Sequence, residues 1–403
     1  AGAVYITLEL RGVTMRAGVR PSALDLWFSV ATIVVVLEFT RRTTGNAIFL
    51  LALAAIAYGL FGNHLPDMIA HRGYSAERLL TYLYTNNGVF NIPLGSSATF
   101  IYLFVLFGAL MMASGAGDYL IRLAMAVSGR SRGGPAKVAI TASGFFGMIN
   151  GTSAGNVVAT GSMTIPLMKR TGYTPTMSAS VEAVASSGGQ ILPPVMGAAA
   201  FLMVGMTGIA YTEIIVAAAI PALLYFLAVF MMAHFEAVNR GIGGVPDDAP
   251  GTDRQTLLTG LYFLIPPAVL ILCLLVLNVS IIRAGLFAIL ATLVVSWFRR
   301  STRVGPREAT RAMIDAAASI LPIAATCATA GLIMGVLNLT GLGLKLATAI
   351  ITLTGGSLEL TMLLAMLVTI VLGMGLPTVA AYAITAVVVA PAVSSVLPLS
   401  WPL

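Results

Sequence analysis

Charged side chains are scarce in this sequence. Asp, Glu, Lys and Arg make up 9% of its 403 residues, whereas a typical soluble domain carries about 25%. A soluble chain of this length would need far more polar surface to cover its core, so a soluble globular protein is excluded. The net charge of +7 does not indicate nucleic-acid binding, because the basic residues are scattered singly or stand at the ends of apolar runs.

Residue types that build metal, redox or catalytic centres are also few. The chain has two cysteines and three histidines. Cys273 and Cys327 both lie inside apolar runs, where packing is expected rather than a disulfide or a metal site. The sequence contains no Ser/His/Asp or Cys/His set and no phosphate-binding glycine loop leading to lysine. It therefore predicts neither an enzyme nor an organic cofactor.

The sequence is rich in long apolar runs. Hydrophobic residues make up 58% of the chain, and the mean hydropathy is +0.95. Runs that approach the length of a bilayer crossing predict an all-α polytopic membrane protein. The candidate spans are Leu24–Phe39, Ala47–Phe61, Ala98–Met112, Met177–Met206, Tyr211–Met232, Leu257–Val279, Ile281–Trp297 and Met313–Leu337. Five arginines between Arg299 and Arg311 place that connector on the cytoplasmic side.

An internal repeat is visible at one fixed offset. A small-Gly-x-Gly corner followed by an amphipathic run begins at Ser114 and again at Thr340. A Gly-Met pair follows each corner at the same distance, at Gly147 and at Gly373. Because an odd number of crossings separates the two copies, they are expected to have opposite orientation. Inverted repeats are typical of secondary transporters, which bind substrate and coupling ion between them near the membrane midplane.

The repeat predicts four parts of the chain. These are an N-terminal membrane and interfacial segment at 1–95, a first inverted repeat at 96–232, a connecting loop with a transmembrane hairpin at 233–311, and a second inverted repeat at 312–403. The second copy of the segment that starts at Met177 would begin where the sequence ends. The second repeat is therefore expected to be truncated, and the chain to be a fragment.

Each repeat carries an apolar run interrupted by a glycine-rich tip. In the first copy the tip is 150–156, and basic residues flank both ends of the run, which predicts a re-entrant helical hairpin. The second helix would start at the tip, so its free amides would favour an anion there. In the second copy the tip is 373–378, where Pro377 suits the first turn of a new helix. An ordinary loop, or a simple proline kink, is the alternative for each tip.

A third polar interruption falls inside the span Met177–Met206. Two glycines and two prolines within 186–194 cannot sit in an unbroken helix, so the helix is expected to open there and expose carbonyls suited to Na⁺. A kink that serves only packing is the alternative. Glu182 precedes the break and is assigned to an ion pair with Lys169 or Arg170, with a proton carrier as the alternative.

Two sets of residues are predicted to form the site. The predicted substrate-binding residues are Asn150, Gly151, Ser153, Asn156, Thr160, Gln190, Pro193 and Thr378. The predicted Na⁺ ligands are Asn150, Ser153, Ser186, Ser187, Gly188, Gly373, Gly375 and Thr378. Na⁺ or H⁺ is the expected coupling ion.

Long motifs in these segments resemble a known family. GMINGTSAGNVVATGS at 147–162, followed by IPLMKRTGY at 165–173, is similar to the hallmark hairpin of the large subunits of TRAP (tripartite ATP-independent periplasmic) transporters. EAVASSGGQILPPVMGAA at 182–199 and GMGLPT at 373–378 resemble the branch that is fused to its small subunit and served by TAXI-type binding proteins. The likeness runs along nearly the whole chain.

The resemblance implies an elevator-type symporter, multi-pass in the bacterial inner membrane. A periplasmic TAXI-type solute-binding protein would deliver a small organic anion, such as a C4-dicarboxylate or a related acid, and a Na⁺ or H⁺ gradient would drive its uptake. A small-subunit membrane region, fused or separate, would be a further partner, and 1–95 would hold its remnant. The alternatives are a passive channel-like facilitator and a non-transporting membrane scaffold.

Overall fold

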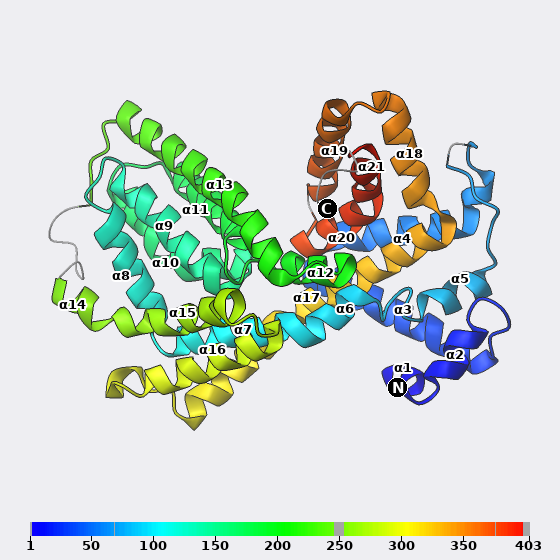
Figure 1. The fold of residues 1–403 in the computed structure, drawn as a ribbon, viewed down its shortest axis with the longest axis horizontal. Helices are drawn as coiled ribbons and strands as arrows, with labels where there is room; N and C mark the ends of the chain where they lie inside the picture. The colour runs from blue at the N-terminus through cyan, green and yellow to red at the C-terminus, as the bar shows by residue number, and fades with distance from the viewer. Residues whose placement is uncertain (1, 68, 246–253, 375, 398–403) are drawn as a thin grey trace. The chain divides into compact units, whose positions relative to one another are not determined.

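The computed structural model describes residues 2–67, 69–245, 254–374 and 376–397, and this part of the chain forms helices without any β-strand (Figure 1). Five helical segments are long and apolar enough to cross a bilayer. They are α3 (Ala23–Thr44), α4 with a 3₁₀ turn (Asn46–His64), α6 to α7 (Ile92–Ala113), α13 (Tyr211–Asn239) and α17 (Pro306–Thr340). The prediction of an all-α polytopic membrane protein is confirmed.

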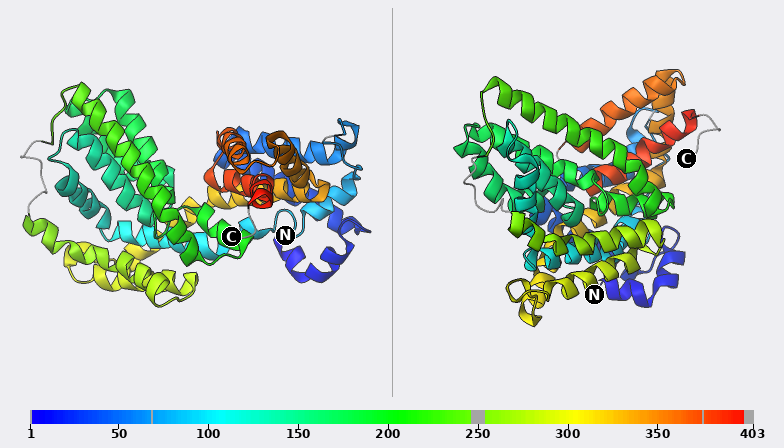
Figure 2. Two further views of the ribbon diagram at one scale, coloured as in Figure 1. Left: turned by 45° about the horizontal axis from the view of Figure 1, so that its top comes forward. Right: turned by 60° about the vertical axis from the view of Figure 1, so that its left-hand side comes forward.

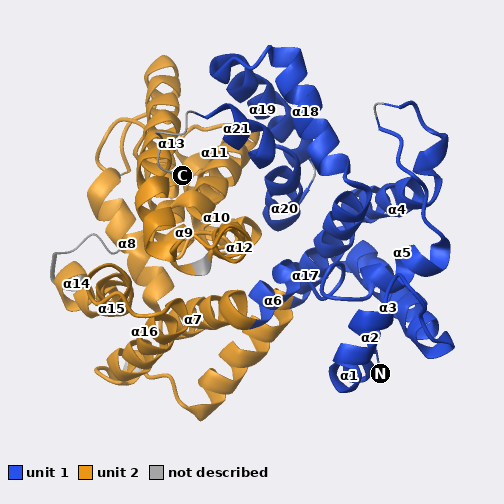
Figure 3. Cartoon of the chain, turned by 45° about the vertical axis from the view of Figure 1, so that its right-hand side comes forward, with its two compact units in different colours: residues 1–98, 321–403 blue, residues 99–320 orange. Residues whose placement is uncertain are grey.

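The chain forms two compact units, which Figure 3 distinguishes by colour. Unit 1 contains residues 1–98 and 321–403, and unit 2 contains residues 99–320. The chain passes from one unit to the other twice. The first passage lies within the π-helical turn Ser97–Ile101, and the second lies within α17, directly before Pro322. The four-part division expected from the sequence stays a prediction.

Unit 1 joins N-terminal helices to the second half of α17. Its N-terminal helices are α1 (Gly2–Leu8), α2 (Leu10–Arg16), α3, α4 (Asn46–Phe61) and α5 (Ala76–Leu83). Thr40 on α3 donates a hydrogen bond of 3.1 Å to the carbonyl of Ala325 on α17, and its hydroxyl lies 2.7 Å from that of Thr329. The helices that follow α17 are α18 (Leu342–Thr354), α19 (Leu358–Gly373), α20 (Thr378–Val388) and α21 (Ala390–Val396).

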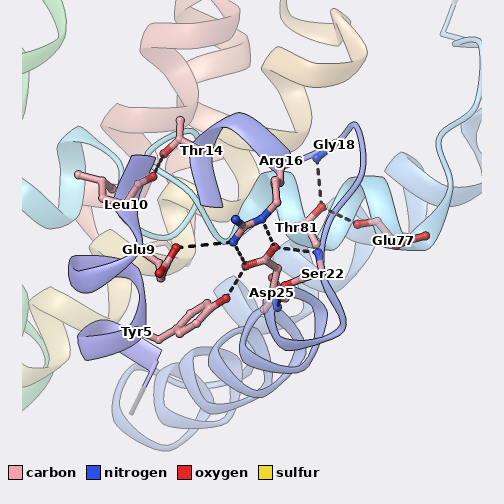
Figure 4. A network of polar contacts seen from close by, with 11 residues as sticks. Tyr5, Glu9, Leu10, Thr14, Arg16, Gly18, Ser22, Asp25, Glu77 and Thr81 are labelled. Atoms are coloured by element: carbon pink, nitrogen blue, oxygen red, sulfur yellow. Dashed lines mark hydrogen bonds and ion pairs between the residues drawn. The ribbon is translucent and has the colours of Figure 1, made fainter. Parts of the chain in front are cut away.

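A buried carboxylate holds the first three helices of unit 1 together (Figure 4). Asp25, in the first turn of α3, forms a capping box with Ser22. Its side chain also accepts hydrogen bonds from Tyr5 Oη at 2.7 Å and from Arg16 Nε at 3.0 Å. Tyr5 belongs to α1 and Arg16 ends α2. One side chain therefore fixes the start of α3 against the two helices that precede it.

Unit 2 contains the first hairpin and the broken helix. Its elements are α7 (Tyr102–Ala113), α8 (Ala116–Ser128), α9 (Gly134–Asn150), α10 (Ser153–Arg170), α11 (Pro175–Gly188), η3 (Gly189–Ile191), α12 (Ala198–Thr207), α13, α14 (Arg254–Thr259), η4 (Leu261–Leu264), α15 (Ile265–Ile271), η5 (Leu272–Val276), α16 (Ile281–Ser296), η6 (Arg300–Thr302) and the first half of α17. Helices α9, α10, α11 and α13 pack side by side in Figures 1 and 2. Small and apolar side chains such as Ala136, Ile140, Val181 and Ala233 form the core between them.

The repeat appears in the bounds of the helices. Helix α8 and helix α18 have 13 residues each, and each begins directly after a glycine in the left-handed conformation. These glycines are Gly115, with φ of 84°, and Gly341, with φ of 71°. The left-handed region favours glycine, so both corners depend on that residue. Each corner is followed by one helix and then a helical hairpin, α9–α10 in unit 2 and α19–α20 in unit 1. The opposite orientation of the copies stays a prediction.

The predicted interruption of the span Met177–Met206 is confirmed. Helix α11 ends at Gly188, a 3₁₀ turn follows, and α12 begins at Ala198.

The prediction that the cysteines pack in apolar surroundings is also confirmed. Cys273 in η5 of unit 2 and Cys327 in α17 of unit 1 are free and buried.

Candidate functional site

The first hairpin and the broken helix touch through glycines. A Cβ atom placed on Gly147 of α9 would lie 2.2 Å from Gly189 Cα, so the two backbones are in direct contact. At the tip of the hairpin Gly151 adopts a φ of 65°, and a Cβ atom there would lie 2.6 Å from the carbonyl oxygen of Met196. Only glycine allows this approach, because no side chain keeps the backbones apart.

Two helix N-termini converge where the tip meets the break. Helix α10 starts at Ser153, within the tip, and α12 starts at Ala198, directly after the break. Gly197 N donates a hydrogen bond of 2.6 Å to the carbonyl of Gln190, and a Cβ atom on Gly197 would lie 3.3 Å from Gly151 O. Helix N-termini carry unpaired amides and a partial positive charge. Their convergence creates a local preference for an anion.

A buried carboxylate surrounded by hydroxyl groups lies in the same bundle. Glu182 on α11 has 0% exposure. Its side chain accepts hydrogen bonds from Ser143 Oγ at 3.0 Å, from Thr164 Oγ1 at 2.5 Å and from Thr160 Oγ1. Ser186 Oγ lies 3.5 Å from Glu182 Oε1, and Asn156 Nδ2 donates to the carbonyl of Ser143 at 2.8 Å. We call Ser143, Asn156, Thr160, Thr164, Glu182 and Ser186 the Glu182 cluster.

The predicted ion pair of Glu182 is wrong. Lys169 and Arg170 end α10 with exposed side chains, and among the described residues neither forms an ion pair with Glu182. The carboxylate faces the hydroxyl groups of α9 and α10 instead. Gly161 makes room for it, since a Cβ atom at that position would lie 3.1 Å from Glu182 Cγ.

Several predicted residues of unit 2 are brought together. Asn156, Thr160 and Ser186 belong to the Glu182 cluster. Gly151 and Gln190 both contact Gly197 at the junction of tip and break.

Other predicted residues stand apart from the cluster. Ser187 is exposed, and its hydroxyl donates to the carbonyl of Ala183 in its own helix at 2.8 Å. Gly188 lies beneath the ring of Tyr225, 2.4 Å from Cε1 to a Cβ atom placed on the glycine. Ser153 and Pro193 are partly exposed near the tip and the break.

The predicted residues of the second hairpin belong to unit 1. Gly373 ends α19 and Thr378 begins α20, and both are exposed. Gly375 lies outside the described residues, as does the side chain of Asn150, the last residue of α9.

The sequence-based prediction did not include Ser143 or Thr164 in the site. A signal for Thr164 is present: Asn156, Thr160 and Thr164 follow each other at intervals of four residues and form one polar stripe along α10. No such periodicity marks Ser143. In the described part of the chain no three His, Cys, Asp or Glu side chains gather at a metal-binding distance.

Comparison with known proteins identifies relatives of this chain. The sequence profile described as "Tripartite ATP-independent periplasmic transporter, DctM component" matches residues 31–397. The isethionate TRAP transporter permease protein DctMQ of Oleidesulfovibrio alaskensis is 29% identical over 203 residues, which is 49% of this chain and 30% of that protein. The C4-dicarboxylate TRAP transporter large permease protein DctM of Pseudomonas aeruginosa is 29% identical over 36% of this chain and 33% of that protein. The chain thus spans about a third of the length of these relatives.

A solved structure shares the fold. The YdaH transporter of Alcanivorax borkumensis superimposes with a TM-score of 0.54 at 20% sequence identity, over 90% of this chain and 82% of that one. The helices of bilayer length and the two hairpins agree with a multi-pass membrane protein. Since the DctM profile covers nearly the whole sequence, the chain belongs to the family of TRAP transporter large permeases, whose members are transporter components and not enzymes.

Proposed function

We propose that this chain is the permease component of a binding-protein-dependent secondary transporter. It imports small organic anions, carboxylates such as C4-dicarboxylates or related acids, across the bacterial inner membrane. A Na⁺ or H⁺ gradient drives the uptake. A periplasmic solute-binding protein of the TAXI type delivers the substrate, and a small-subunit membrane region, fused or separate, completes the permease.

The convergence of two helix N-termini carries the proposal for an anionic substrate. The starts of α10 and α12 meet through Gly151 and Gly197, and the free amides of these helix ends attract a carboxylate. The Cβ atom and the backbone carbonyl oxygen of Gln190 lie beside Gly197, so this residue borders the same place. The relatives named above for isethionate and C4-dicarboxylates point to the same class of ligand.

Transport by an elevator motion follows as the proposed mechanism. The glycine contacts of Gly147 with Gly189 and of Gly151 with Met196 join α9, α10 and the broken helix into one block. This block, with the arm α8, moves together with the bound anion. The second hairpin is α19–α20 of unit 1. Each hairpin enters and leaves the membrane on a single side, and the inverted repeat gives the two hairpins opposite orientations.

Uptake into proteoliposomes tests the proposal. The full-length permease is reconstituted with its binding protein, and uptake of labelled dicarboxylates, sulfonates and amino acids is followed with a Na⁺ gradient and separately with a pH gradient. We expect accumulation of an organic acid that needs both the binding protein and one of the gradients. Uptake that is indifferent to both gradients would instead identify a passive facilitator, and absence of uptake under all conditions would favour a scaffold.

A further inference from the structure

The carboxylate of Glu182 has no positive partner in the described structure. It is fully buried, and an ionised carboxylate away from water is strongly unfavourable unless a counter-charge or several hydrogen bonds compensate it. The buried amine of the same bundle does not serve this purpose. Lys137 Nζ lies 3.2 Å from His234 Nδ1 and 4.8 Å from the centre of the Phe230 ring.

The Glu182 cluster has fewer hydrogens than its oxygen contacts require. Thr160 Oγ1 lies 2.8 Å from the carbonyl of Asn156 and also contacts Glu182 Oε1. Thr164 Oγ1 lies 3.0 Å from the carbonyl of Thr160 and 2.5 Å from Glu182 Oε2. A hydroxyl group has one hydrogen and cannot donate fully to both acceptors. One additional positive charge, placed among these oxygens, would supply the missing counter-charge of Glu182 and would also satisfy the acceptor oxygens that lack a hydrogen.

We propose that the Glu182 cluster binds the monovalent cation that drives transport, either Na⁺ held by the carboxylate and hydroxyl oxygens or a proton held by the carboxyl group. The inference rests on the proposed function. Oxygen ligands of this kind suit hard cations, and a single carboxylate is neutralised by a single charge. The hydroxyl groups of Ser143, Thr160 and Thr164 complete the site from α9 and α10.

The position of the cluster connects cation binding to the anion site. Glu182 belongs to α11, whose last residue, Gly188, precedes the break. Asn156 on α10 binds the Ser143 carbonyl on α9, next to the contact of Gly147 with Gly189. A neutralised Glu182 holds α11 against α9 and α10, so that tip and break meet. An ionised Glu182 favours hydration and weakens that packing.

Other titratable side chains lie on the helices of the bundle. They are Lys137 on α9, Lys169 and Arg170 on α10, and Tyr211, Glu213, Tyr225, His234 and Glu236 on α13. Among the hydrogen bonds and ion pairs described, none joins one of these side chains to Glu182. Within the bundle, Glu182 is therefore the group whose charge an added cation would neutralise.

The experiment measures cation binding apart from transport. The unfolding temperature of the purified full-length protein is recorded against NaCl concentration, with choline chloride as balance, and against pH from 5 to 8 without Na⁺. If Na⁺ is the ligand, Na⁺ stabilises the wild-type protein; if the proton is the ligand, low pH does. In either case we expect Glu182→Gln, which is neutral at every pH, to lose that response.

Glu213→Gln is the matched control. Glu213 is exposed in the first turn of α13, away from the cluster, so the variant should respond as the wild type does. In proteoliposomes Glu182→Gln should exchange substrate across the membrane but no longer accumulate it against a gradient. Equal Na⁺ and pH responses in wild type and Glu182→Gln, or normal accumulation by the variant, would overturn the inference.

A second variant keeps the inference testable if Glu182→Gln does not fold. Thr164→Val keeps the shape of the side chain and removes one hydroxyl group. The Na⁺ concentration, or the proton concentration, at which half of the stabilisation is reached should therefore change about tenfold. An unchanged midpoint would contradict the site. A failure of the proposed function looks different: the wild type would then transport nothing under any gradient, although the cation response and its loss in Glu182→Gln remain.

Discussion

Gly147 and Gly189 face each other where α9 meets the break after α11. Gly189 has φ of −57°, which any residue adopts, so space and not backbone conformation makes glycine necessary there. A Cβ atom on Gly189 would lie 2.7 Å from Gly147 Cα, closer than real Cβ atoms approach other atoms. The neighbour is backbone, which cannot turn aside as a flexible side chain would.

The first prediction concerns Gly189→Ala. The added methyl group forces the hairpin and the broken helix apart, and overpacking of this kind costs about 1–3 kcal/mol. We expect a lower unfolding temperature in detergent and a loss of uptake. Gly95→Ala is the control, because Gly95 is exposed in α6 and a Cβ atom there would meet nothing within 4 Å. Equal destabilisation by both substitutions would contradict the close contact.

The locations of single residues were predictable where the residue type and its position within an apolar run indicate the same role. Gly151, Asn156 and Gln190 were expected near a ligand because amides and glycines interrupt an apolar run, and they do lie at the tip, in the cluster and at the break. The partner of Glu182 was not predictable from charge alone. The sequence shows Lys169 and Arg170 nearby along the chain, but only the packing of α10 on α11 turns the threonines, and not the end of α10, toward the carboxylate.

At the scale of elements, glycine and proline residues predicted best where helices begin and end. The corners at Gly115 and Gly341, the hairpin tip at Gly151 and the break after Gly188 all stand where the sequence predicts them. The N-terminal helices α1 and α2 were not predicted. They have seven residues each, and their attachment depends on Asp25, which lies nine residues after Arg16 and 20 after Tyr5. Local patterns carry no signal for such a contact.

The second prediction concerns Asp25→Asn. Asn cannot form the ion pair with Arg16, so α1 and α2 should detach from the start of α3. Loss of a buried, charged hydrogen-bond partner costs about 1–3 kcal/mol. We expect trypsin to cleave after Arg16 several times faster in detergent, as followed by mass spectrometry.

Glu9→Gln is the matched control for Asp25→Asn. Glu9 also faces Arg16, but at 4.0 Å and with a side chain that is 54% exposed, whereas that of Asp25 is 2% exposed. Exposed ion pairs contribute about 0–1 kcal/mol, so cleavage should hardly change. If both variants were cleaved at the same increased rate, Arg16 and not the buried carboxylate would be the anchor of the segment.

At the scale of the whole molecule, both passages between the units lie within helical segments. The first is the π-helical turn Ser97–Ile101 and the second is next to Pro322 in α17. Proline has no amide hydrogen for the carbonyl of Ala318, one turn earlier, and its ring disturbs that turn. Irregular turns of this kind are frequent at hinges. We therefore expect α17 to bend at Pro322 during transport.

The third prediction concerns Pro322→Ala. Restoring the hydrogen bond should raise the unfolding temperature, by a stabilisation of up to about 3 kcal/mol, and should slow uptake because the helix stiffens. Pro306→Ala is the control, since Pro306 opens α17, where a missing amide costs nothing. Uptake at the wild-type rate in a stabilised Pro322→Ala protein would exclude a hinge at this position.

The two cysteines have a practical consequence for all of these measurements. One free, buried thiol lies in each unit, Cys327 in unit 1 and Cys273 in unit 2. A maleimide dye that fluoresces on reaction would reach each thiol only after the surrounding helices open on heating. Cys273→Ala and Cys327→Ala would then record the melting of unit 1 and unit 2 separately. A substitution in the Glu182 cluster should lower the temperature at which Cys273 reacts and leave that of Cys327 unchanged.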